Sequence, residues 1–336
     1  FLIHKKGEKP PIGSKWIPCH MIFDIKMDFT RKARFVAGGH VTDPPTSITY
    51  SSVVARDSVR LAFLIAALND LEILAADIGN AYLNAPTRER VHTTCGLEFG
   101  PNYQGCTAVI IKALYGLKSS GAAWRAMFAG TLQDLQYKSS LADPDVWLRP
   151  AIKGTGEHYY EYIFVYVDDI LVISMTPERT MSTLATFYRL KENSVAKPSV
   201  YLGAQIREHR LPDNPSKLMW SMSAEKYLKE ALRNLDSLLS KEGKRLPTKI
   251  VTPLSNNYRP ELDVSPLLDQ AHHTLYMQLM GILRWAVELG RIDIHLSVAL
   301  MAQYLAQPRL GHLDQLYHIF AYIKAHLRSR IVLDPT

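Results

Sequence analysis

Two adjacent carboxylates, Asp168 and Asp169, restrict the possible folds of this chain more than any other feature of its sequence. The apolar runs YIFV, at residues 162–165, and ILVI, at residues 170–173, lie on either side of them. Both runs are rich in β-branched and aromatic side chains, which favour strands. The pattern therefore predicts a β-hairpin that carries two acidic residues at its tip.

Paired carboxylates at the junction of two buried strands are unfavourable unless something compensates their charge. A divalent cation is one compensation, because hard cations bind carboxylate oxygens. The alternative is an Asp-Asp turn that turn chemistry and solvent exposure explain. The local pattern alone does not decide between these two interpretations.

A third acidic residue, Asp77, ends another strand-like run, ILAA at residues 73–76. An Asp at a strand end together with a remote Asp pair is a common way to build a two-metal site for phosphoryl transfer. In such a site, cations about 4 Å apart bind the attacking and leaving oxygens. The sequence therefore predicts that Asp77, Asp168 and Asp169 are metal ligands and catalytic residues.

Composition sets broad limits. With 47% hydrophobic residues, the 336-residue chain can bury a sizeable core and is not disordered. Its formal net charge of +7 favours a nucleic-acid partner only slightly. Its 3 cysteines form no CxxC pair, which indicates a reducing compartment and argues against a zinc site. We expect no membrane partner, because no apolar run reaches membrane-spanning length.

The hydrophobic pattern elsewhere predicts an α+β fold with a strand-rich part before a mostly helical one. Residues 15–38 predict a basic β-hairpin with Lys26, Lys32 and Arg34 facing outward. Residues 57–70 predict a buried helix, apolar nearly all round, which leads into the strand of the third acid.

Further helices are expected near residues 120–135 and from Pro177 onward. The segment 207–217 is charged and contains Pro212 and Pro215, and we predict a domain boundary there. Beyond it, one helix is expected to begin at Ser223. Further helices are expected over residues 267–289, 294–305 and 312–327.

Six segments, in order along nearly the whole chain, resemble the reverse transcriptase of Ty1/copia-type long-terminal-repeat retrotransposons. They are KARFVA at 32–37, DIGNAYLN at 77–84, ALYGLK at 113–118, YVDDILV at 166–172, YLGAQI at 201–206, and the region 276–294. A single YVDD would be a weak signal, whereas the ordered set is specific.

Three places depart from the family pattern. Residues 118–124 read KSSGAAW where the family often has KQAPRAW, and residues 290–294 read GRIDI in place of TRPDI. The segment between Gly39 and Tyr50 is also shorter than usual. These changes affect the expected template contacts and leave the three carboxylates untouched.

The resemblance implies a right-hand polymerase with fingers, an antiparallel-sheet palm and a helical thumb. It places a fingers β-hairpin region at residues 1–56 and a catalytic palm at 57–210, with a fingers insertion at about 100–160. A mostly helical thumb or connection-like region follows at 211–336. Family members carry a downstream ribonuclease H domain, which we do not expect within this chain. Because the first residue is Phe, we expect an excerpt of a longer Pol polyprotein or of a degenerate genomic copy.

The implied function is RNA-directed DNA polymerase activity, in which dNTPs are added to a primer 3′-hydroxyl by two-metal phosphoryl transfer. The expected cofactor is a pair of Mg²⁺ ions, for which Mn²⁺ can substitute. Asp77 and Asp168 would hold both ions, and Asp169 would complete the site. The expected partners are an RNA/DNA template-primer duplex and dNTPs, and the expected location is the cytoplasm, within a virus-like particle, and later the nucleus. The oligomeric state stays open.

Two other functions stay open at this point. One is a catalytically inactive polymerase-fold fragment of a decayed element that still binds nucleic acid. The other is a metal-dependent nuclease built on the clustered acids.

The resemblance also assigns residues to the triphosphate. Lys32 and Arg34 are candidates for the β- and γ-phosphates, because Arg offers a bidentate fork and Lys a point charge. The backbone amides of Ile78 and Gly79 are further candidates, since a glycine lets a ligand approach closely. Lys197 could protonate the leaving pyrophosphate, although most lysines are merely solvated.

The remaining assignments concern the sugar, the base and the primer. Tyr82 is the predicted gate that excludes a ribose 2′-hydroxyl, with a buried core aromatic as the alternative. Tyr115 is a candidate to stack on the base or sugar, or it is simply buried. Tyr166, Leu202 and Gly203 are assigned to the primer side.

Overall fold

The computed structural model describes residues 1–25, 31–46, 48–210, 215 and 217–335. The chain forms two compact units. Unit 1 comprises Phe1–Val59 and Glu72–Ala196, and unit 2 comprises Arg60–Leu71 and Lys197–Thr336. Among the described residues, no helix has the length and apolar character that crossing a membrane requires.

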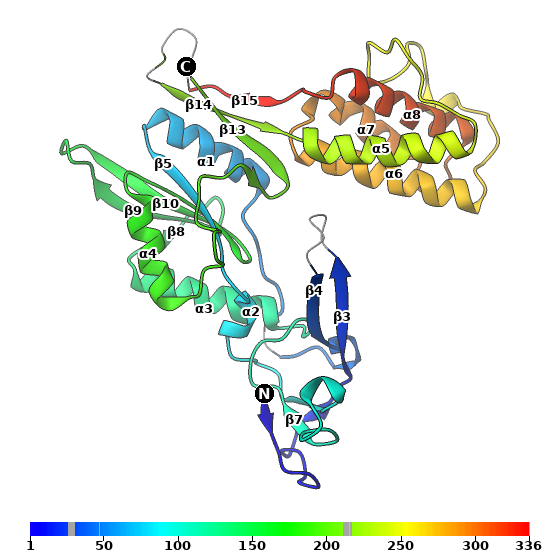
Figure 1. Ribbon diagram of the computed structural model, residues 1–336. Coiled ribbons are helices and arrows are strands. Elements are labelled where there is room, and N and C mark those ends of the chain that lie inside the picture. The colour runs from blue at the N-terminus through cyan, green and yellow to red at the C-terminus, as the bar shows by residue number, and fades with distance from the viewer. Residues whose placement is uncertain (26–30, 47, 211–214, 216, 336) are drawn as a thin grey trace. The chain divides into compact units, whose positions relative to one another are not determined.

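A five-stranded antiparallel sheet forms the centre of unit 1 (Figure 1). Its strand order is β5-β11-β10-β9-β8. The predicted hairpin is confirmed, because β10 and β11 pair antiparallel with Tyr166 opposite Asp169. The bounds are β5 Glu72–Asp77, β8 Lys138–Ser139, β9 Val146–Ile152, β10 His158–Tyr166 and β11 Asp169–Ser174.

Two helices pack against this sheet around one core (Figure 1). They are α3, Ser120–Asp134, and α4, Pro177–Phe187, and both agree with the helices expected from the sequence. Trp124, Phe128 and Leu184 are almost fully buried between helices and strands. Each such side chain stabilises the fold by about 1.5–3 kcal/mol relative to exposure.

The N-terminal part of unit 1 contains two further sheets. The first has four strands in the order β1-β7-β6-β2. The second is the two-stranded hairpin of β3 and β4, whose ladder runs from Cys19 opposite Ala37 to Ile25 opposite Arg31. The bounds of these elements and of the short helices here are β1 Leu2–Ile3, β2 Lys15–Trp16, β3 Cys19–Ile25, β4 Arg31–Ala37, η1 Gly39–Val41, α2 Ala81–Asn84, β6 Val91–Thr94, η2 Leu97–Phe99 and β7 Thr107–Val109.

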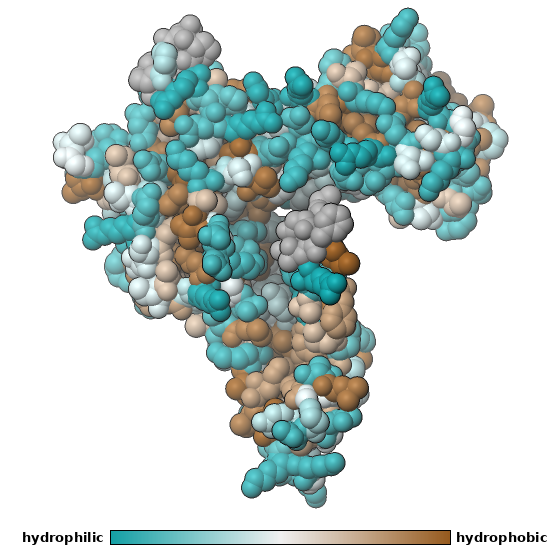
Figure 2. Space-filling model, viewed as in Figure 1, coloured by the Kyte–Doolittle hydropathy of each residue, from teal (hydrophilic) through white to brown (hydrophobic). Residues whose placement is uncertain are grey.

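The expected basic hairpin is therefore confirmed over a shorter range, because β2 pairs with β6 instead. Lys26, predicted to face outward, lies outside the described residues. Three apolar side chains of the hairpin's first strand, β3, lie at the surface. Ile22, Phe23 and Ile25 are 43%, 76% and 66% exposed, and Figure 2 shows apolar surface over this segment.

Helix α1, Arg56–Leu68, begins in unit 1 and continues in unit 2. Its position agrees with the sequence, but it is not buried all round: Leu61 is 53% exposed and Leu68 is 49% exposed. On its buried side, the ring of Phe63 packs 5.4 Å from that of Trp220.

Unit 2 combines a helical cluster with a four-stranded sheet of order β12-β13-β14-β15. Helix α5 shows why the cluster forms, since Leu228, Leu232, Leu235 and Leu239 recur at helical spacing and are all buried. The bounds are β12 Val200–Tyr201, β13 Ala204–Arg210, β14 Leu218–Ser223, α5 Glu225–Lys241, η3 Pro260–Leu262, α6 Gln270–Glu288, η4 Ile292–Ile294, α7 His295–Ala302, α8 Leu310–Ala325 and β15 Ile331–Leu333.

The expected α+β fold is thus confirmed, and the long helices follow the sequence pattern. Strands β14 and β15 were missed, because we expected a mostly helical region after residue 210 and placed no strand in it. The predicted boundary at 210/211 falls between β13 and β14, which pair with each other. In this part of the chain, the compact units divide between Ala196 and Lys197. The division into fingers, palm and thumb stays a prediction.

Candidate active site

The pairing of β5 with β11 brings the three acidic residues together. Asp77 is directly opposite Asp169 in this antiparallel pair. Just beyond it, the Ile78 backbone N–H donates to the Asp168 carbonyl oxygen at 2.8 Å. The three acids therefore lie together, at the end of β5, at the start of β11 and in the turn that precedes β11.

The turn that presents Asp168 is strained and braced. Val167 has φ = +58°, a left-handed conformation that is rare for a β-branched residue. The indole Nε1–H of Trp124 donates to the Val167 carbonyl oxygen at 2.7 Å. Because Trp124 is itself buried in the core of unit 1, the turn is held by the packing beneath it.

The carboxylates disfavour one another's ionisation. Burial, followed by the charge of Asp77, raises the pKa of Asp168 above its usual range. Burial raises the pKa of Asp169 to about 6, with further contributions from Asp168 and Asp77. Lys191 opposes both shifts. The site thus concentrates negative charge that a cation would neutralise.

The three acids have the donor chemistry of a divalent-cation site. Within the described residues, no group of three or more His, Cys, Asp or Glu side chains is already arranged to hold a metal ion. The donor chemistry does fit, because hard cations take carboxylate oxygens. Asp77 also contributes a buried Oδ1 that accepts no hydrogen bond in the described structure. The three acids are suitable ligands whose mutual repulsion opposes their convergence without a cation.

Lys191, which sequence reasoning missed, lies directly against this site. Its ammonium forms an ion pair with Asp77 Oδ2, and its Nζ is 4.0 Å from Asp168 Oδ2. Nothing in the local sequence marks it, because the contact depends on how the segment after α4 folds back. Lys197, the lysine considered from the sequence, belongs to unit 2 and pairs with Glu208 at 3.1 Å.

A cavity of about 460 Å³ opens beside the acids. It brings together five predicted site residues, among them two cations and two aromatics. The rings of Tyr82 and Tyr115 are 5.0 Å apart, and the Arg34 guanidinium is 5.8 Å from the Tyr115 ring. The predicted residues in its lining are Lys32, Arg34, Tyr82, Tyr115 and Asp168.

The hairpin of β3 and β4 is fixed to the cavity by a close backbone approach. The Ala37 N–H donates to the Tyr115 carbonyl oxygen at 2.8 Å. Gly116 has φ = +93°, and a Cβ there would lie 2.0 Å from the Ala37 carbonyl oxygen. A glycine is therefore required at this position, and it sets Tyr115 against the strand that carries Arg34.

Comparison with known proteins decides the family. Residues 2–231 match the model of the reverse transcriptase (RNA-dependent DNA polymerase) family. The chain belongs to this family. The predicted Ty1/copia-type resemblance is confirmed.

Curated relatives are Pol polyproteins of transposons. The chain is 24% identical over 331 residues to the retrovirus-related Pol polyprotein from transposon TNT 1-94 of Nicotiana tabacum, covering 94% of this chain and 23% of that polyprotein. It is 25% identical over 328 residues to that from transposon RE1 of Arabidopsis thaliana, covering 94% and 20%. It is 25% identical over 308 residues to the transposon Ty1-NL2 Gag-Pol polyprotein of Saccharomyces cerevisiae, covering 90% and 17%. The chain thus spans about a fifth of the length of the curated relatives it matches.

One sequence assignment for this reverse transcriptase domain concerns backbone amides that are already hydrogen-bonded in this structure. We expected the Ile78 and Gly79 amides to bind the triphosphate. The Ile78 N–H donates to Asp168 and the Gly79 N–H donates to the Arg189 carbonyl oxygen, both at 2.8 Å. The Ile78 proton continues the pairing of β5 toward the Asp168 turn, and the Gly79 proton binds the segment after α4, so neither is free for a ligand in this structure.

The primer-side assignments are divided between the units. Tyr166 ends β10 in unit 1, next to the acidic turn. Leu202 and Gly203 form the two-residue turn between β12 and β13 in unit 2, where both have positive φ. The primer-side role of all three residues stays a prediction.

The segment that departs from the family pattern at residues 118–124 is well integrated. The buried Ser119 donates its N–H and its hydroxyl to Glu89 Oε1, at 2.9 and 2.7 Å. The Ser120 hydroxyl donates to the Leu114 carbonyl oxygen at 2.7 Å. Both serine hydroxyls at the start of α3 are therefore satisfied, so these two serines are compatible with the local fold.

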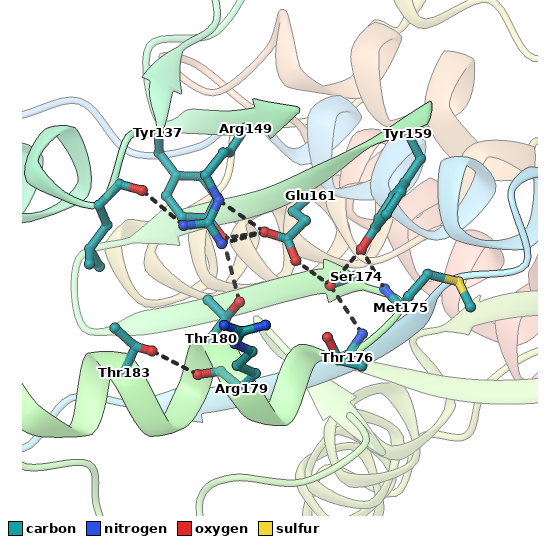
Figure 3. Close-up of polar contacts among 11 residues, drawn as sticks. Tyr137, Arg149, Tyr159, Glu161, Ser174, Met175, Thr176, Arg179, Thr180 and Thr183 are labelled. Atoms are coloured by element: carbon teal, nitrogen blue, oxygen red, sulfur yellow. Dashed lines mark hydrogen bonds and ion pairs between the residues drawn. The ribbon is translucent and has the colours of Figure 1, made fainter. Parts of the chain in front are cut away.

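A second cavity of unit 1, of about 490 Å³, lies over other residues of β9, β10 and α4 (Figure 3). Its lining includes the buried acidic residue Glu161, which is 7% exposed. Arg149 donates to Glu161 Oε2 from Nε at 3.0 Å and Nη2 at 2.5 Å, and the Ser174 hydroxyl donates to Oε1 at 2.7 Å. The Arg149 guanidinium also lies 4.5 Å from the Tyr137 ring. These groups satisfy one another and form a structural ion pair.

Proposed function

We propose that this domain is an RNA-directed DNA polymerase that adds dNTPs to a primer 3′-hydroxyl. The observation that carries the proposal is the pairing of Asp77 with Asp169 beside the turn of Asp168, next to a cavity lined by cations and aromatics. Family membership supports the same activity. A nucleotide-sized cavity that adjoins clustered carboxylates is suited to phosphoryl transfer.

Asp77, Asp168 and Asp169 would hold two divalent cations, with Mg²⁺ the proposed ion and Mn²⁺ a substitute. When bound, the ions supply charge neutralisation and Lewis acidity at the transferred phosphoryl group. The raised pKa of Asp169 supports this assignment, because a group that resists ionisation gains most from a neighbouring cation.

Lys32 and Arg34 would bind the triphosphate tail of the nucleotide. Both lie on β4 and line the cavity with Asp168. Lys32 already favours the ionised form of Asp168, which means that its charge acts on the acidic site. An arginine fork suits bidentate binding of phosphate oxygens.

Tyr82 would lie against the sugar and exclude a 2′-hydroxyl. It stands at the start of α2, and its ring packs on that of Tyr115 at the cavity wall. Burial raises the pKa of both phenols, so both stay neutral at neutral pH. Such a wall leaves little room for one extra hydroxyl.

A primer-extension assay on an RNA template tests the proposal. The folded protein should lengthen a labelled DNA primer in the presence of Mg²⁺ or Mn²⁺ and all four dNTPs. An inactive nucleic-acid-binding fragment would retard the duplex in a gel and extend nothing. A nuclease would shorten the primer. Either of these outcomes would refute the polymerase assignment.

A further inference from the structure

Lys191 is fixed against Asp77 from two directions. Its backbone N–H donates to the Asp77 carbonyl oxygen at 2.8 Å. Its ammonium then folds back and donates to Asp77 Oδ2. The same Nζ is 4.0 Å from Asp168 Oδ2, so one cation lies between two of the three acids.

The turn that follows Lys191 builds this position. The Ser194 hydroxyl accepts from the Asp77 N–H at 3.2 Å and donates to the Lys191 carbonyl oxygen at 2.8 Å. Asn193 takes a left-handed φ of +58°, which closes the turn. On the other side, the Arg189 carbonyl oxygen accepts from the Gly79 N–H at 2.8 Å. The strand of Asp77 is therefore tied to the Lys191 segment both before and after the lysine.

The location of the ammonium matters for cation binding. Carboxylates that share a divalent cation must turn their oxygens toward a common point. In this structure Lys191 already draws Asp77 Oδ2 to itself and approaches Asp168. A unit positive charge and a divalent cation at the same point would repel each other strongly.

We propose that Lys191 is an internal counter-ion that neutralises Asp77 and Asp168 in the metal-free protein and must leave them before a divalent cation binds. It thus stabilises the empty site and weakens the first cation's apparent affinity. The Lys191 side chain is 48% exposed and also lines the cavity, so it can swing away without disturbing the core. The inference rests on the proposed function only in requiring that these acids bind a cation.

Mn²⁺ binding to the protein alone tests this, without nucleotide or nucleic acid. Electron paramagnetic resonance would count free Mn²⁺ for the wild type, Lys191→Met and Lys191→Arg. Lys191→Met should bind the first Mn²⁺ about tenfold more tightly and should melt at a lower temperature when metal-free. Lys191→Arg keeps the charge and should remain within about threefold of wild type. The matched control is Lys138→Met, at an exposed position of β8.

An unchanged or weaker Mn²⁺ affinity in Lys191→Met would overturn the counter-ion role. If Lys191→Met does not fold, Lys191→Gln, which keeps a polar end, gives the same comparison. Asp77→Asn separates this inference from the proposed function. If Asp77→Asn binds Mn²⁺ as tightly as the wild type, the acidic metal site itself is refuted. If Asp77→Asn loses Mn²⁺ binding, the metal site stands, and an unchanged affinity in Lys191→Met refutes only the role of Lys191.

Discussion

Asp77 and Asp169 are directly opposite each other on neighbouring antiparallel strands, although they lie far apart in the sequence. The register of β5 with β11 therefore sets the spacing of the acidic site. A slip of one residue would move one carboxylate to the other face of the sheet. The backbone positions of the site are thus fixed by the sheet, and its unfavourable feature is the repulsion among the three carboxylates.

Asp169→Asn should stabilise the metal-free protein at neutral pH. The folded-state pKa of Asp169, about 6, exceeds the ordinary 3.8. Between about pH 4 and pH 6 the folded state keeps a proton that the unfolded state loses, so the free energy of unfolding falls as pH rises through this window. After discounting for partial exposure, Asn should gain about 1–2 kcal/mol at pH 7.5 and nothing near pH 4.

Urea denaturation in EDTA at pH 4, 6 and 7.5 measures this gain. Asp134→Asn, at an exposed position near the end of α3, is the control and should change little at any pH. A destabilised Asp169→Asn at pH 7.5 would show that the carboxylate is favourable in the metal-free fold.

Gly116→Ala should destabilise the fold where the backbone beside Tyr115 meets β4. The new Cβ would overlap the Ala37 carbonyl oxygen at 2.0 Å, and the φ of +93° would itself be strained. We expect a loss of about 2–4 kcal/mol by urea denaturation. The control is Gly130→Ala within α3, where a Cβ meets nothing within 4 Å and should stabilise by about 0.5–1 kcal/mol. Equal effects of the two substitutions would refute the close approach.

Tyr82→Ala should relax sugar selection. Removing the ring opens the cavity wall beside Tyr115, so a 2′-hydroxyl would fit. The ratio of kcat/KM for a dNTP over the matching rNTP should fall about 10- to 100-fold in primer extension. Tyr82→Phe keeps the ring and should retain the wild-type ratio. If Tyr82→Ala leaves this ratio unchanged, Tyr82 is only a core aromatic and does not select the sugar.

Arg149→Met should cost about 2–3 kcal/mol, because it leaves the buried Glu161 carboxylate without its main partner. This lies below the range for a fully buried pair, since the Arg149 side chain is 34% exposed. Adding Glu161→Gln should recover at least half of the loss, as a double-mutant cycle would show. Arg233→Met removes a pair with Glu230 in which the Arg233 side chain is 66% exposed, and it should cost less than about 0.5 kcal/mol. A cost for Arg149→Met no larger than this control would refute the ion pair's importance.

The sequence predicted the hairpin of Asp168 and Asp169 because the two apolar runs, rich in β-branched and aromatic residues, are local signals. The cavity residues Lys32, Arg34 and Tyr115 came from family motifs, and the structure brings them together with Tyr82. What the sequence could not predict depends on tertiary contacts.

Lys191 is the clearest case, since a left-handed turn at Asn193 and bonds through Ser194 place it on Asp77. The hydrogen bond of the Ile78 amide could not be predicted for a similar reason, because only the pairing beyond Asp77 shows that its proton is used. Strand β14 was missed because its apolar side chains suit either a helix or a strand, and its partner β13 lies across a charged, proline-containing segment.

The central claim is that the acids of β5 and the β10–β11 turn form a polymerase centre. Single-turnover incorporation of one dNTP on an RNA-templated primer, with Mg²⁺, tests it most directly when wild type and Asp168→Asn are compared. We predict that Asp168→Asn lowers the incorporation rate by at least about 1,000-fold while the affinity for the duplex stays within about threefold. Incorporation by a folded Asp168→Asn protein within about tenfold of wild type would contradict the account.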